Sequence, residues 1–89
     1  MKLKSRPQDI TELDLTTELD LILYNDDFNT FDFVIGTLVD EFNHDYLQAV
    51  QIAHIVHNNE KCSIKKGFYN ELKPKYDSLF EKGLSVRIE

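Results

Sequence analysis

The chain has 89 residues, which is enough for one domain with a modest core. Its formal net charge of −6 disfavours nucleic acid as a partner, because phosphates must be met by lysine and arginine. A single cysteine, Cys62, excludes an internal disulfide, and no apolar stretch approaches the roughly 18 residues of a membrane span. The basic N-terminus lacks the apolar segment of a secretory signal, so we expect a cytoplasmic protein that does not associate with membranes.

The acidic residues are concentrated in the first half of the chain. Residues 9–20 hold five acids, and residues 21–45 hold six more, without any lysine or arginine. Seven of the ten basic residues lie in 61–87. An acidic half attracts cations or basic segments of a partner, although the need for solubility would explain the same pattern equally well.

The first predicted element is a strand. Residues 1–18 are polar with few large apolar groups, and we expect them to form a flexible arm ahead of a folded domain at 19–89. In residues 19–23 every second residue is leucine, which is typical of a strand with one buried side. Asn25-Asp26-Asp27 should end this strand, because Asn and Asp favour turns by bonding to nearby backbone.

Two helices are predicted next. Asn29 or Thr30 can cap the first, whose apolar side chains recur at helical spacing: Phe31, Val34, Ile35, Leu38 and Phe42. Asn43-His44 should end it. Asp45 can cap the second helix, and Asn58-Asn59 should stop it. The apolar stripe of this helix is Ala49, Ile52, Ala53 and Val56, with His57 one turn beyond Ala53 on the same side.

In the last third of the chain, the sequence predicts a strand, then a helix, then a second strand. Residues 61–65 favour a strand, and Gly67 a turn. Pro74 is tolerated in a first helical turn, so the third helix should begin near Glu71 or Lys73 and stop at Lys82-Gly83. Residues 84–88 alternate as a final strand. The order β-α-α-β-α-β implies an α+β fold with helices packed on a small sheet.

The polar residues that flank the first two helices suggest a binding site. Asn25, Asp26 and Asp27 supply carboxylates and an amide from a loop, and His57 supplies an imidazole from the end of the second helix. Together with apolar neighbours they could surround a small cation such as a free amino group.

The same residues carry a resemblance to a known family. The run Leu23-Tyr24-Asn25-Asp26-Asp27, the later Val56-His57 and the ending Gly83–Glu89 resemble ClpS, the adaptor of the ATP-dependent Clp protease. The similarity spans about residues 19–89. It implies a three-stranded antiparallel sheet packed against three helices. It also implies a protein that is not an enzyme and that needs no cofactor or metal.

The resemblance further implies a function and partners. ClpS adaptors bind N-degron proteins that begin with Leu, Phe, Tyr or Trp, and they deliver these substrates to the N-terminal domain of a ClpA- or ClpC-type AAA+ unfoldase. Their N-terminal extension is mobile and is engaged by the unfoldase during delivery, so we expect the same of residues 1–18. A monomer is expected.

Site residues can be assigned by the same resemblance. Asn25, Asp27 and His57 match the positions that hold the substrate α-amino group, and Asp26 matches the adjacent acid. The pocket for the first side chain has walls at Val34, Val56 and Leu84. Phe31 and Ala53 stand where many members carry methionine, which leaves the side-chain preference open. The third helix, with Pro74, also departs from the family pattern.

Other interpretations of the same residues remain. A docking module of the ribosomal-stalk type would need no amine pocket. A small metal-dependent enzyme could use the pairs His54/His57 or Asp40/His44, which have helical spacing suited to metal ligands. Without the resemblance, Asn25-Asp26-Asp27 would most often be a plain turn, and Phe31, Val34 and Val56 would be core.

Overall fold

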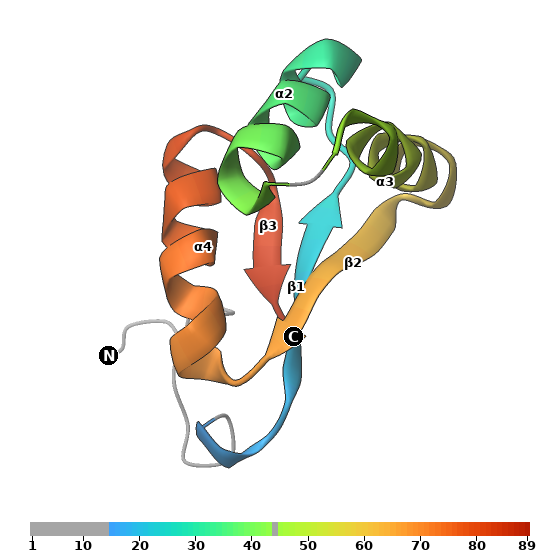
Figure 1. Cartoon of the computed structure of the whole chain (residues 1–89). Coiled ribbons are helices and arrows are strands. Elements are labelled where there is room, and N and C mark those ends of the chain that lie inside the picture. Colours follow the sequence, from blue (N-terminus) through green and yellow to red (C-terminus); the bar gives the residue numbers. More distant parts are fainter. Residues whose placement is uncertain (1–14, 44) are drawn as a thin grey trace.

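The computed structural model describes residues 15–43 and 45–89, which form one antiparallel sheet and three helices. In chain order the elements are β1 (Leu19–Tyr24), α2 (Phe31–Phe42), α3 (Tyr46–Asn59), β2 (Lys61–Gly67), α4 (Tyr69–Glu81) and β3 (Val86–Ile88). The expected β-α-α-β-α-β order and the α+β class are confirmed. In Figure 1, α2 and α3 lie beyond the carboxyl end of β1, and α4 runs alongside the sheet.

The sheet has the order β2-β1-β3, so the first strand lies in its centre. Leu21 pairs with Ile88 and Leu23 pairs with Val86, all on one buried face. The register of β1 against β2 shifts between Leu21 and Ile22. The central position explains why the leucine alternation of β1 was so regular: one of its faces forms the floor of the core.

The helix caps follow from local sequence. The Thr30 hydroxyl accepts from the backbone N–H of Phe33 at 3.1 Å, and the Asp45 carboxylate accepts from that of Gln48 at 2.7 Å. Each such cap is worth about 1 kcal/mol. Asn43 ends α2 in the left-handed conformation, as expected, whereas α3 includes both Asn58 and Asn59 and ends at Glu60.

The start of α4 differs from the prediction. The helix begins at Tyr69 rather than near Glu71 or Lys73, so Pro74 lies in its second turn. The Glu71 carboxylate accepts from the backbone N–H of Phe68 at 2.8 Å and so secures the first turn. Tyr69 is buried, as are Leu72 and Leu79 further along the helix. Tertiary burial on both sides of the proline therefore outweighs the one backbone hydrogen bond that its ring removes.

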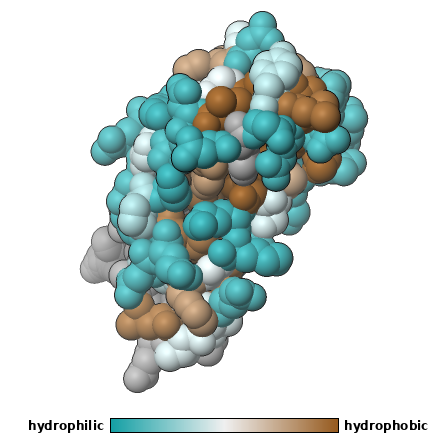
Figure 2. Space-filling view, viewed as in Figure 1, coloured by the Kyte–Doolittle hydropathy of each residue, from teal (hydrophilic) through white to brown (hydrophobic). Residues whose placement is uncertain are grey.

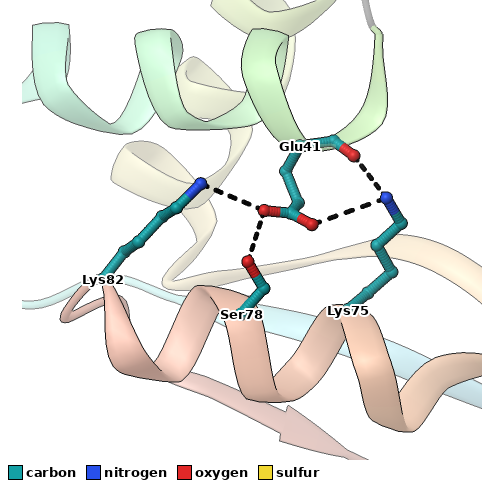
Figure 3. A network of polar contacts seen from close by, with 4 residues as sticks. All are labelled: Glu41, Lys75, Ser78 and Lys82. Atoms are coloured by element: carbon teal, nitrogen blue, oxygen red, sulfur yellow. Dashed lines mark hydrogen bonds and ion pairs between the residues drawn. The ribbon is translucent and has the colours of Figure 1, made fainter.

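A half-buried carboxylate joins α2 to α4. Glu41 accepts a hydrogen bond from the Ser78 hydroxyl at 2.6 Å and pairs with Lys82 and Lys75 at 3.1 and 3.5 Å, as Figure 3 shows. Lys75 also donates to the backbone carbonyl of Glu41 at 2.5 Å. The Ser78 hydrogen bond, aided by Lys82 and opposed by burial, holds the pKa of Glu41 below its ordinary value of 4.5.

Replacing this carboxylate by an amide should weaken the fold in a pH-dependent way. Because the folded pKa is lowered, the ionised Glu41 stabilises the protein above about pH 4.5 and loses this effect as the pH falls through the folded pKa. We expect Glu41→Gln to cost about 1–2 kcal/mol near pH 7 and much less near pH 3. Denaturant unfolding at both pH values measures this, with the exposed Glu81→Gln on α4 as control. An equal cost at both pH values would contradict it.

Candidate functional site

The Asp26 carboxylate shapes the loop between β1 and α2. Its Oδ1 accepts from the backbone N–H groups of Phe28 and Asn29, at 3.0 and 2.9 Å. Its Oδ2 accepts from the side-chain amide of Asn29 at 2.8 Å and from the Ser85 hydroxyl at 2.7 Å. Bonds from an aspartate to backbone two and three residues later are typical of a tight polar turn. Both oxygens of Asp26 are therefore occupied within the chain itself.

Two further contacts fix this loop to distant segments. The Asn29 amide donates to the Gly83 carbonyl at 2.9 Å, just before β3, and Gly83 has a φ of +94° that favours glycine. The backbone N–H of Asn25 donates to the Glu60 carbonyl at 2.9 Å, just after α3. The loop is thus held from both sides before any ligand binds.

Burial and hydrogen bonding act in opposite directions on Asp26. Burial is the largest single influence and disfavours the charged form. The hydrogen bonds from Ser85, Asn29 and Phe28 together outweigh it and hold the pKa of Asp26 below its ordinary value. Asp26 therefore stays ionised at neutral pH as part of the scaffold.

A hollow of about 500 Å³ opens between this loop, the start of α2 and the face of α3. This volume is within the range of small-ligand sites, about 300–1,000 Å³. Its lining is Asn25, Asp26, Asn29, Phe31, Val34, Ala53, His54, Val56 and His57. Polar groups come mainly from the loop and the end of α3, whereas apolar groups come from both helices.

Apolar groups also reach the surface around the two helices that form the hollow. Figure 2 shows its largest brown area over α2 and α3. The exposed large apolar residues of these helices are Phe31, Phe33, Tyr46, Leu47 and Ile55. This end of the molecule therefore offers apolar contacts beyond the core.

Seven of the nine candidate site residues line the hollow: Asn25, Asp26, Phe31, Val34, Ala53, Val56 and His57. The remaining two, Asp27 and Leu84, do not line it. Asp27 is exposed and follows directly on Asp26. Leu84 is buried and lines a small recess of about 20 Å³, which shares Val34 and Val56 with the hollow. The structure brings the seven lining residues together around one hollow, and the individual roles of all nine stay predictions.

Three polar side chains expected to bind the amine are without a hydrogen-bond partner in the part of the chain that the structure describes. Within residues 15–43 and 45–89, neither the side chain of Asn25 nor the imidazole of His57 has a hydrogen-bond partner, and the Asp27 carboxylate has none either. Polar groups at a concave surface without a protein partner can accept hydrogen bonds from a bound cation. Asp26 differs from these three because its acceptors are already used.

Two lining residues were missed from the sequence. His54 was named only as a possible metal ligand, yet it lines the same hollow. Successive helical residues are about 100° apart, so residues 53, 54, 56 and 57 together cover an arc of about 160° on α3, with His54 at its edge. The second missed residue, Asn29, was expected only as a possible cap. Its position three residues after Asp26 was the available signal.

Metal ligation has no clear geometric basis in the described part of the chain. Among residues 15–43 and 45–89 no three His, Cys, Asp or Glu side chains are grouped so that they could hold an ion. The pair Asp40/His44 includes a residue outside the described ones. Every helix in the same ranges is too short or too polar to span a bilayer.

The fold and the hollow define a small α+β domain with a preformed, ligand-sized site at one end of its sheet. The family model described as ATP-dependent Clp protease adaptor protein ClpS matches residues 16–87. The chain therefore belongs to the ClpS family and is an adaptor of the Clp protease. ClpS adaptors partner with Clp AAA+ proteases and with substrates. The family match therefore favours a ClpS-type adaptor over a docking module of the ribosomal-stalk type.

A solved structure supports the same fold. The chain is similar to Agrobacterium tumefaciens ClpS2, with a TM-score of 0.68 and 19% sequence identity over 81% of this chain and 94% of that one. That protein was solved bound to L-phenylalaninamide. A comparison with curated protein sequences found no match.

Proposed function

We propose that this adaptor binds proteins whose first residue is large and hydrophobic and delivers them to a ClpA- or ClpC-type AAA+ unfoldase. The observation that carries the proposal is the combination of free acceptors and apolar walls around one hollow. The N-terminus of a polypeptide presents the matching combination, because its α-ammonium group and its first side chain are attached to the same carbon atom.

We assign binding of the α-amino group to the side chains of Asn25, Asp27 and His57. A charged amine that leaves water needs an acceptor for each of its three N–H donors. The side chains of Asn25 and His57 line the hollow and have no hydrogen-bond partner among the described residues, and Asp27, two residues after Asn25, offers a carboxylate. Asp26 contributes by holding the loop in place.

The apolar walls take the first side chain. Burying a Leu or Phe side chain is worth about 1.5–3 kcal/mol, and a charged hydrogen bond contributes a similar amount. Neither alone gives useful affinity, so recognition requires both. The L-phenylalaninamide bound to Agrobacterium ClpS2 has a free amine beside a benzyl group, which is the chemistry proposed for the ligand of this chain.

Delivery would use other parts of the protein. The proposal includes engagement of residues 1–18 by the unfoldase, a cytoplasmic location and a monomeric state. Residues 1–14 lie outside the described ones, so their role rests on the family resemblance alone.

Acetylation of the substrate amine tests the proposal. A peptide that begins with Leu should bind about a hundredfold more tightly than its acetylated copy, because acetylation removes the charge and two N–H donors. Fluorescence anisotropy with both peptides measures the ratio, and a Gly-initiated peptide controls for the side chain. Equal binding of the free and acetylated forms would instead indicate a docking surface that does not recognise the amine.

A further inference from the structure

Two aromatic rings from different helices meet at the hollow. Phe31 is the first residue of α2, and His54 lies in the middle of α3. Their ring centroids are 4.9 Å apart, and their planes are inclined at 63°, which is an edge-to-face contact. Both residues line the hollow, and Phe31 keeps 39% of its surface exposed. The pair therefore presents ring surface to whatever enters.

The surroundings of the pair leave room for a further ring. Ala53, which precedes His54, adds only a methyl group to the wall. His57 places a third ring one turn beyond Ala53 on α3, and the other apolar walls are the valines Val34 and Val56. The hollow thus has ring-bearing residues on both helices and a small residue, Ala53, in its α3 wall.

We propose that the Phe31–His54 ring pair makes this hollow select an aromatic first side chain over an aliphatic one of the same size. The inference rests on the proposed function, because it concerns the side chain beside the captured amine. Aromatic rings attract one another in edge-to-face or offset arrangements at centroid distances of about 4.5–7 Å, beyond the gain from buried area. Neither Phe nor His at these positions was expected to form such a pair.

A purely structural role for the pair makes a different prediction. In that role the rings serve only to pack α2 against α3. In that case their removal lowers the stability of the fold and weakens all ligands in proportion. A role in selection changes the ratio between an aromatic and an aliphatic ligand, which a packing defect leaves unchanged.

The test compares two peptides that differ only at the first residue, phenylalanine or cyclohexylalanine. The two side chains have the same carbon skeleton and are close in size, but only the phenyl ring is planar and has a π system. The wild-type protein should bind the phenylalanine peptide about two- to tenfold more tightly. His54→Leu and Phe31→Leu should each bring the ratio to about one. Phe33→Leu is the control, because Phe33 lies on α2 with 44% of its surface exposed and does not line the hollow.

The outcomes are separable. The inference is overturned if the wild-type protein binds both peptides equally, or if His54→Leu and Phe31→Leu keep the wild-type ratio. Either result leaves the proposed function intact, provided that acetylated copies of the two peptides bind weakly. If acetylated and free peptides bind alike, or neither binds, then the proposed function fails and the selection inference falls with it.

Discussion

Asp26→Ala should lower both the stability of the protein and its affinity for a Leu-initiated peptide. The carboxylate accepts four hydrogen bonds, two from backbone N–H groups and two from side chains. Removing an ionised acceptor leaves these donors without a partner, and we expect a loss of about 2–3 kcal/mol in the free energy of unfolding. The loop would also lose its contact with Ser85, so the side chain of Asn25 would be held less firmly at the hollow.

Asp27→Ala is the matched control for this prediction. Asp27 is the next residue and also a carboxylate, but it is exposed and has no partner within the described residues. We expect its removal to change stability by less than about 0.5 kcal/mol while weakening peptide binding about tenfold or more. Urea unfolding measures the stability of both variants, and peptide titration measures their affinity for the Leu-initiated peptide. If Asp27→Ala destabilises the fold as much as Asp26→Ala, the division into scaffold and ligand-binding carboxylates is wrong.

Ala53→Met should narrow the hollow and act most strongly on the largest first side chain. Ala53 is almost fully buried and forms part of the wall on α3. A methionine there occupies space that an indole ring requires, and overpacking forces neighbours off their preferred rotamers. We expect affinity for a Trp-initiated peptide to fall about tenfold or more, and that for a Leu-initiated peptide to change about threefold at most.

Ala49→Met provides the comparison. Ala49 lies one turn earlier on α3 and is fully buried in the core, but it does not line the hollow. Overpacking there should lower stability by about 1–3 kcal/mol without changing the order of preference among first residues. Affinities for Leu-, Phe-, Tyr- and Trp-initiated peptides measure both variants. An unchanged order in Ala53→Met would mean that this wall does not limit the first side chain.

The elements that the sequence predicted well are those stabilised by neighbours in the chain. Thr30 and Asp45 cap their helices through backbone groups three residues away, and Asn43 ends α2 within the same turn. The leucine alternation of residues 19–23 identified the central strand because one face of β1 is buried. Such patterns are visible in one dimension, since the interacting groups are close in sequence.

The predictions that failed depend on contacts between distant segments. The start of α4 was placed too late because the burial of Tyr69 outweighs the preference of Pro74 for a first turn. His54 was not assigned to the binding site, but the start of α2 brings the Phe31 ring into contact with the His54 ring. Helical periodicity gives the direction of a side chain and not the element that it meets.

The sequence by itself determined the order of elements and the α+β class, because hydrophobic periodicity and capping act over a few residues, and the resemblance to a known family assigned most residues of the hollow. Only the tertiary structure decided which acid of the loop is used within the fold and which remains available for a ligand. Asp26 and Asp27 are alike in sequence, yet Ser85 reaches Asp26 across 59 positions of chain and uses its carboxylate, while Asp27 remains exposed. Which polar groups stay open to a ligand depends on such long-range partners, and these exist only after β3 has paired with β1.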